Sequence, residues 1–110
     1  MRAANWFRPD RRLGIPLPDL PRPWDDLTPA EKREAAAVWE MIRARIPDRI
    51  RHLEVEIAGK QERLAGEPDF AACCRLNEEI AELAARINEL NIWLRTEPDL
   101  GEGSDGGKSR

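Results

Sequence analysis

The sequence predicts an all-α protein built around an antiparallel coiled-coil helical hairpin, and three observations support this fold class. An apolar repeat with alternating spacings of three and four residues runs through 69–95. A glycine-containing turn at 66–69 separates it from a second segment with heptad spacing. Charged residues make up 35% of the 110 residues and aromatic residues 5%, a composition typical of exposed helices. We expect an extended proline-rich arm over 1–27, a three-helix domain over 28–97 and a disordered tail over 98–110.

The arm is expected to be extended because prolines stand at positions 16, 18, 21 and 23. Proline fixes φ and lacks an amide proton, so neither a helix nor a central strand suits this stretch, and a polyproline-like conformation is predicted. Large apolar residues, among them Trp24, interrupt the prolines. Two interpretations stay open: the arm docks on the helices of its own chain, or it is a proline-rich ligand for a partner domain.

The segment TPAE, which begins at Thr28, marks the start of the first helix. Thr28 can cap the free amides, Pro29 suits the first helical position, and Glu31 can complete a capping box. The apolar residues that follow recur on one helix face, and Trp39 is the largest of them. Pro47 then predicts a kink or a short break before the next helix.

The second helix is expected over about 48–65 and the third from near Asp69 to about Arg95. Gly66 is the expected stop between them. The apolar stripe of the third helix comprises Cys73, Leu76, Ile80, Leu83, Ile87, Leu90 and Leu94. Because the connecting turn is short, the two helices are expected to lie antiparallel.

Composition and charge exclude several function classes. The net charge is −3, and no segment carries the basic excess that nucleic-acid binding requires. No apolar run reaches the length of about 18 residues that a membrane span needs. The N-terminal stretch lacks the apolar core of a secretory signal, and two adjacent cysteines cannot join distant parts of the chain. We therefore expect a cytoplasmic protein that binds neither nucleic acid nor membrane.

Cys73 and Cys74 are the residues that could carry chemistry. Consecutive helical residues point in different directions, so adjacent thiolates converge poorly on one metal, and the spacing of a Cys-x-x-Cys site is absent. Packing is the favoured interpretation. The alternative is redox sensing, or an intermolecular bridge through Cys74. The lone His52 lacks the partner that acid–base catalysis needs. Without a catalytic triad or a phosphate loop, neither an enzyme nor a bound cofactor or metal is expected.

Several side chains are candidates for contact with a protein partner. A tryptophan beside polar amides, as in the segment INELNIW, is typical of interface hot spots. The alternative for the amides is that they fix contacts between the helices. The acidic run Glu78, Glu79 and Glu82 is interpreted as a solvated face. Arg75–Glu79 and Glu82–Arg86 are expected ion pairs four residues apart. The candidate partner-binding residues are Phe70, Trp93, Asn91, Trp24 and Trp39.

The segment AGEPDFAACCRLNEEIAEL resembles a UVR motif over about residues 53–87. This short helical hairpin occurs in the B and C subunits of the bacterial nucleotide-excision nuclease, in Clp ATPase subunits and in the activator of a bacterial protein-arginine kinase. The shared features are an acidic turn, the Asp69-Phe70 pair, small residues at 71–74, and the apolar residues Leu76 and Ile80.

The resemblance implies a protein-docking element with Phe70 as the anchor at the mouth of the hairpin. It implies neither nuclease nor kinase activity. The sequence departs from the motif at Asn77 and Glu78, which replace the familiar Arg-Asp pair, and at the two cysteines, which stand where alanine is common.

Residues and resemblance together predict a small, non-catalytic interaction protein or adaptor that acts through its helical hairpin. One alternative is a thiol-based redox or metal-responsive regulator that uses Cys73 and Cys74. Another is a structural homodimer in which two hairpins form a four-helix bundle, because a two-helix hairpin must bury its remaining apolar flank against something.

Overall fold

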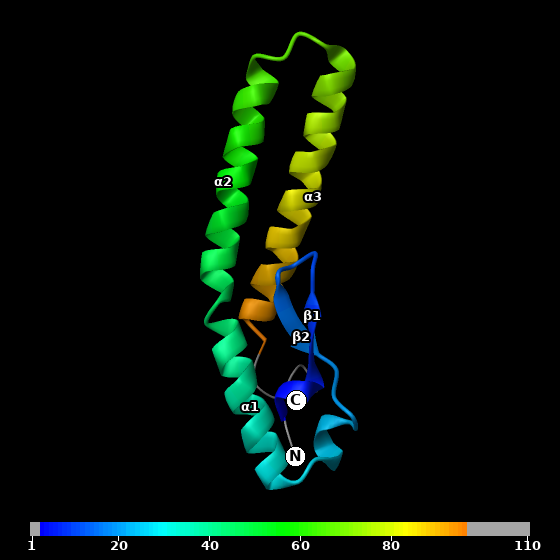
Figure 1. Cartoon of the computed structure of the whole chain (residues 1–110), viewed down its shortest axis with the longest axis vertical. Coiled ribbons are helices and arrows are strands. Elements are labelled where there is room, and N and C mark those ends of the chain that lie inside the picture. The colour runs from blue at the N-terminus through cyan, green and yellow to red at the C-terminus, as the bar shows by residue number, and fades with distance from the viewer. Residues whose placement is uncertain (1–2, 97–110) are drawn as a thin grey trace, which may run out of the picture.

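A computed structural model describes residues 3–96, and these residues form three helices and a small antiparallel sheet. Helix α1 (Pro29–Arg43) leads into α2 (Ile46–Ala65) as one long bent helix, and α3 (Phe70–Leu94) returns beside α2 (Figure 1). The predicted tail over 98–110 lies outside the described residues.

The predicted helix starts are confirmed by their capping hydrogen bonds. Thr28 Oγ1 accepts a hydrogen bond from the Glu31 amide at 3.1 Å, and the Glu31 carboxylate accepts one from the Thr28 amide at 2.9 Å. The Asp69 side chain caps α3 by accepting a hydrogen bond from the amide of Ala72 at 2.9 Å. These bonds satisfy amides that have no partner within their own helix.

The bend and the turn also lie where the sequence predicts them. Pro47 stands in the first turn of α2, where its missing amide proton is not needed, and α1 ends at Arg43. The buried Ile46 fixes the junction of the two helices against the core. Gly66 follows the last residue of α2, and its amide donates to the carbonyl oxygen of Arg63 at 3.2 Å.

The expectation of an all-α fold is confirmed only in part, because the mostly helical structure also contains a β-hairpin in the arm. Strand β1 (Phe7–Asp10) pairs antiparallel with β2 (Ile15–Pro18), between short 3-10 segments at Ala3–Trp6 and Trp24–Asp26. In the register of this sheet Pro9 lies opposite Pro16. A two-stranded sheet has only edge strands, which tolerate the missing amide of proline. Proline is thus excluded from a central strand but not from an isolated hairpin.

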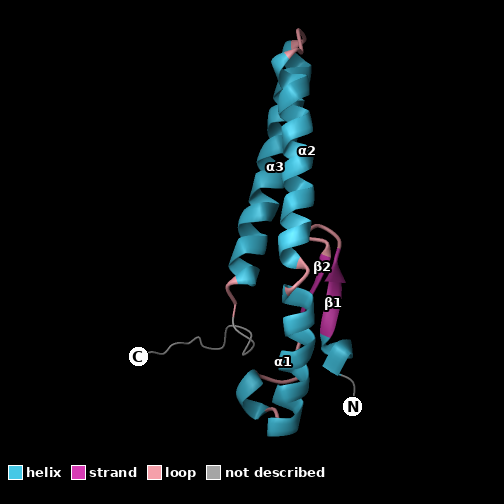
Figure 2. Cartoon of the chain, turned by 90° about the vertical axis from the view of Figure 1, so that its left-hand side faces the viewer, coloured by secondary structure: helices cyan, strands magenta, loops and turns pink. Residues whose placement is uncertain are grey.

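The arm packs on its own helices, beside the junction of α1 and α2 (Figure 2). Its buried apolar residues enter the same core as α1 and the C-terminal half of α3. This core comprises Ala3, Trp6, Phe7, Leu13, Ile15, Leu27, Ala35, Trp39, Ile42, Ile46, Leu53, Leu83 and Leu90.

Trp39 lies at the centre of this core and is completely buried. Its indole stacks on Phe7, with ring centroids 6.3 Å apart, and meets the edge of Trp93 at 5.6 Å. The indole Nε1 donates to the carbonyl oxygen of Thr96 at 3.2 Å, so the polar edge of the ring is also satisfied.

The upper halves of α2 and α3 extend beyond this core as an antiparallel pair, as predicted (Figure 1). Leu76 is buried there, outside the main cluster. The coiled-coil geometry of the pair stays a prediction. Within residues 3–96 no helix combines the length and the apolar character that crossing a membrane requires.

Candidate docking surface

The charged side chains of α3 gather on one side of the helix. Successive residues of an α-helix are rotated by about 100° around its axis. On this basis the charged residues occupy an arc about 100° wide, next to the arc that packs on α2. The remainder of the helix circumference carries no charge. The charged residues of α3 are Arg75, Glu78, Glu79, Glu82, Arg86 and Glu89.

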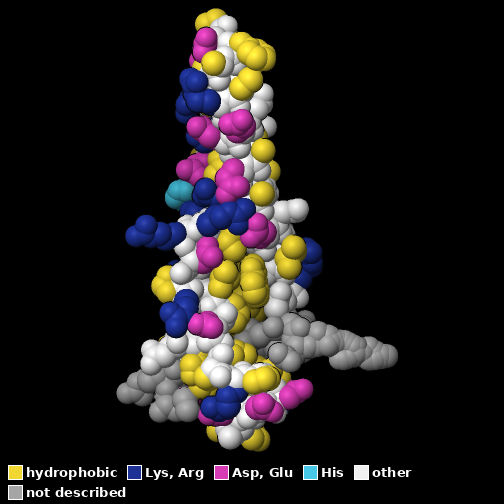
Figure 3. All heavy atoms as spheres, turned by 90° about the vertical axis from the view of Figure 1, so that its right-hand side faces the viewer, with side chains coloured by type: hydrophobic (Ala, Val, Ile, Leu, Met, Phe, Trp, Pro, Cys, Tyr) yellow, Lys and Arg dark blue, Asp and Glu magenta, His cyan; other side chains and the backbone are white. Residues whose placement is uncertain are grey.

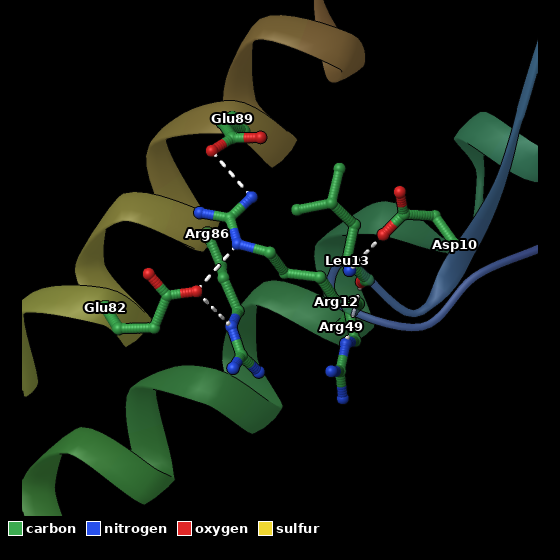
Figure 4. Close-up of polar contacts among 7 residues, drawn as sticks. All are labelled: Asp10, Arg12, Leu13, Arg49, Glu82, Arg86 and Glu89. Carbon is green, nitrogen blue, oxygen red and sulfur yellow. Dashed lines mark hydrogen bonds and ion pairs between the residues drawn. The ribbon is translucent and has the colours of Figure 1, made fainter. Parts of the chain in front are cut away.

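On the charged side of α3, Glu82 and Glu89 bind the arm of the same chain (Figure 4). Arg12, from the turn between β1 and β2, places its Nε 2.6 Å from a carboxylate oxygen of Glu82 and its Nη1 2.7 Å from one of Glu89. Arg86 reaches the same Glu82 oxygen at 3.1 Å. The two guanidinium groups, with Arg12 as the larger cause, hold the pKa of Glu82 below its ordinary value.

The Glu82 side chain keeps 44% of its surface exposed, as a solvated face implies, but it also binds Arg12 and so anchors the arm. The predicted Glu82–Arg86 pair is present. The predicted Arg75–Glu79 pair is not found within residues 3–96, because Glu79 instead accepts a hydrogen bond from Lys60 of α2 at 2.9 Å. Lys60 lowers the pKa of Glu79 chiefly through this bond.

The turn at 11–14 holds Arg12 in position. Asp10 accepts a hydrogen bond from the Leu13 amide at 2.9 Å through its side chain, and one from the Gly14 amide at 2.7 Å through its carbonyl oxygen. Arg49 of α2 donates to the carbonyl oxygen of Leu13 at 2.9 Å. Gly14 adopts a φ of 79°, a conformation that only glycine adopts without strain.

The other side of α3 is exposed and uncharged. Ala84 stands about 160° around the helix from Glu82, where the arm is bound. The exposed residues on this side include two large apolar side chains, Phe70 at 80% and Ile92 at 56% exposure. We define the uncharged face of α3 as the exposed residues Phe70, Cys74, Asn77, Ala81, Ala84, Asn88 and Ile92.

The uncharged face continues into the edge of the α2–α3 seam. The seam residues next to it are only half-buried, and they are Cys73, Ile80 and Ile87. In the upper half of Figure 3, charged side chains lie mostly to the left, and hydrophobic and other uncharged ones line the right-hand edge. A surface helix ordinarily places polar and charged residues opposite its apolar stripe. The apolar and uncharged surface of α3 is thus wider than packing on α2 requires.

The sequence-predicted partner residues separate into two groups in the structure. Phe70 lies exposed at the first position of α3, beside the turn. Trp39 is buried, and Trp93 is half-buried and meets the Trp39 ring edge-on, so part of the Trp93 surface packs on its own chain. Asn91 and Trp24 are half-buried, and the ammonium group of Lys32 lies 6.0 Å from the ring centroid of Trp24.

The two cysteines differ in their surroundings. Cys73 is half-buried, and its thiol lies 3.4 Å from the carbonyl oxygen of Glu67 in the turn. Cys74 is exposed, and both thiols are free. His52 is exposed on α2. Within the described residues, no three His, Cys, Asp or Glu side chains are grouped to hold a metal ion.

Sequence reasoning missed Arg12 as the residue that fixes the arm. Its partners Glu82 and Glu89 are seven positions apart, two helical turns, so they share one side of α3. That spacing was visible in the sequence, but nothing there showed which arginine would meet the pair.

Comparison with protein-family models, with curated proteins and with solved structures found no match. The resemblance of residues 53–87 to a UVR motif stays a prediction.

Proposed function

We propose that this chain is a small, non-catalytic protein-interaction protein that docks a protein partner on its helical hairpin, with α2 and α3 packed as an antiparallel coiled coil. The contact region in this proposal is the uncharged face of α3 with Phe70 at one end. A cytoplasmic location, expected from the adjacent cysteines, belongs to the same proposal.

The observation that carries the proposal is the segregation of charge on α3. In a chain with 35% charged residues, α3 carries six of them and confines all six to one side, so its uncharged face is exposed without any charge. Burying apolar area releases about 25 cal/mol per Å² only when water is excluded from it. A large exposed side chain such as Phe70 gains this contribution only when a partner covers it.

The resemblance to a UVR motif supports the same region. In that comparison Phe70 corresponds to the anchor at the mouth of the hairpin, and the structure exposes this side chain at 80%. An anchor must be free in the unbound chain and become buried in the complex, and side chains of this kind carry most of the binding energy of an interface.

The test adds charge to the face without changing its shape. Tagged wild-type chain and the variant Asn77→Asp/Asn88→Asp are used for affinity capture from the native host, and the captured proteins, including untagged copies of this chain, are quantified by mass spectrometry. We expect the bound protein to be lost in the variant, because a carboxylate is costly to bury without a partner.

The matched control is Asn5→Asp, which makes the same change at an exposed residue of the arm. This control is expected to retain the captured protein. Equal capture by the wild type and the double variant, with circular dichroism showing both folded, would count against the uncharged face as the docking site.

A second candidate function, a thiol-based regulator, is favoured by the exposure of Cys74. Its test is mild oxidation followed by a non-reducing gel, together with metal analysis of the purified chain. An oxidant-dependent covalent product that Cys74→Ser removes and Cys73→Ser retains would support it. A metal-free chain that stays uncrosslinked would remove this candidate.

A further inference from the structure

We infer that the partner on the uncharged face is a second copy of this chain, paired antiparallel through α3 about a two-fold axis at Ala81. This inference rests on the proposed function, because it names the occupant of the same docking face. Two properties of the face favour a second copy: its lack of charge and the placement of its two large residues.

The face is long and narrow. From Phe70 to Ile92 the helix rises about 33 Å, and a single helix with its side chains is about 10–12 Å across. The footprint is therefore about 350 Å² per copy, well below the roughly 800 Å² per partner of interfaces of standard size, so a weak dimer that forms at high concentration is expected.

The charge distribution permits this face to meet a copy of itself. A two-fold interface brings identical surfaces together, so any charge near the axis would face its own copy. The charged arc of α3 carries four glutamates, which would repel each other across such an axis. The uncharged face carries no such penalty, and pairing through it leaves the charged arcs in solvent.

The large residues of the face are placed symmetrically about Ala81. Phe70 stands eleven residues before this alanine and Ile92 eleven residues after it. In an antiparallel pair, Phe70 of each copy therefore lies level with Ile92 of the other, and the small Ala81 lies on the axis, where two helices approach most closely. Both large side chains, exposed at 80% and 56%, become covered by the same contact.

The first experiment measures mass in solution. Sedimentation equilibrium of the full chain, from about 1 μM to 1 mM, is expected to show a shift from the 12.6 kDa chain to twice that mass. The variant Ala81→Glu is expected to weaken the dimer by about 100-fold or more, because two carboxylates then meet at the axis. The matched control Ala37→Glu changes an exposed alanine of α1 and is expected to leave the dimer unchanged.

The second experiment tests the orientation with cysteines. In the antiparallel pair the two Cys74 residues lie about 20 Å apart along the helix, too far for a disulfide. Oxidation of the wild-type dimer is therefore expected to give no covalent product. Ala81→Cys in a Cys73→Ser/Cys74→Ser background is expected to give a covalent dimer, whereas Ala37→Cys in that background is not. A disulfide between the wild-type Cys74 residues within the dimer would overturn the antiparallel arrangement.

The outcomes separate this inference from the proposed function. A mass of one chain at every concentration overturns the second copy, and so does a dimer that Ala81→Glu leaves intact. If the chain is monomeric and Asn77→Asp/Asn88→Asp still abolishes capture of a different protein, the docking face stands with another occupant. If the chain is monomeric and no captured protein depends on the face, both proposals fail.

Discussion

The guanidinium of Arg12 lies 2.6 Å from the carboxylate of Glu82, although the two residues are 70 positions apart in the sequence. Glu89 binds the same guanidinium at 2.7 Å, one heptad further along α3. The contact ties the turn of the β-hairpin to one side of α3. It also leaves the opposite side of that helix open, and this is the side that carries the uncharged face.

Replacing Arg12 by glutamine is expected to lower the stability of the fold at neutral pH. It is also expected to make that stability less dependent on pH in the acidic range. The pKa of Glu82 is lower in the folded chain than in the unfolded chain. The ionised carboxylate therefore stabilises the fold fully above the unfolded-state pKa. This stabilisation is lost as the pH falls through the folded-state pKa. In the wild type, thermal stability is therefore expected to decline below about pH 4.3, and this part of the decline is expected to shrink in Arg12→Gln.

Thermal unfolding of both chains between pH 7 and pH 3 provides the measurement. Arg11→Gln, a change at the exposed neighbouring residue, is the control and is expected to behave like the wild type. Identical acid profiles for Arg12→Gln and the wild type would contradict the role of the Arg12–Glu82 contact.

Replacing Trp93 by alanine is expected to lower the free energy of unfolding by about 2–3 kcal/mol. The change removes the edge contact with Trp39 and leaves a space beside that buried ring. Trp93→Phe keeps part of that contact and is expected to cost less. Urea unfolding at equilibrium measures both values. An unaltered unfolding midpoint in Trp93→Ala would show that this tryptophan is not part of the core.

Replacing Gly14 by alanine is expected to destabilise the β-hairpin by at least about 1–2 kcal/mol. Its φ of 79° is unfavourable for residues with a Cβ, and a Cβ built there would collide with the guanidinium of Arg49. The control is Gly59→Ala, inside α2, where a new Cβ meets nothing within 4 Å. That change is expected to raise stability by about 0.5–1 kcal/mol. Opposite signs in the same unfolding assay confirm the prediction, and equal effects contradict it.

Replacing Phe70 by serine is expected to change the stability of the single chain by no more than about 0.5 kcal/mol, because its side chain is 80% exposed. Leu76→Ser, six residues along the same helix, is expected to cost about 3 kcal/mol or more, because it places a hydroxyl in a buried apolar site. Unfolding is measured at a concentration where the chain is monomeric. A large loss in Phe70→Ser would mean that this residue packs on its own chain.

The helices could be predicted from the sequence because their signals are local. Thr28 and Asp69 cap helices through side chains three residues from the amides they bind, and Pro47 acts on its own turn. The β-hairpin could not be predicted in this way. Its prolines argued against strands, and what stabilises it is the burial of Phe7 and Ile15 against helices far along the chain.

The candidate site could be predicted in part. The resemblance to a UVR motif pointed to Phe70, which is exposed in the structure, and its role as an anchor stays a prediction. The role of Trp93 could not be predicted, because its packing depends on Trp39, and the two residues come together only after α2 and α3 have reversed the chain. The uncharged face can be identified from the sequence without knowledge of the tertiary structure, because the positions of charges around a helix follow from its period alone.

The packing of Trp39 between Phe7 and Trp93 has a consequence for the order of folding. The turn at 66–69 lets α2 and α3 meet through contacts that are local in sequence, and such contacts form early. The core around Trp39, in contrast, can form only when residues near both ends of the described chain are present. At a synthesis rate of about 5–20 residues per second, the arm is synthesised several seconds before Trp93. Its apolar side chains cannot be buried in the core until then. During that interval the apolar side chains of the arm are open to chaperones and to aggregation.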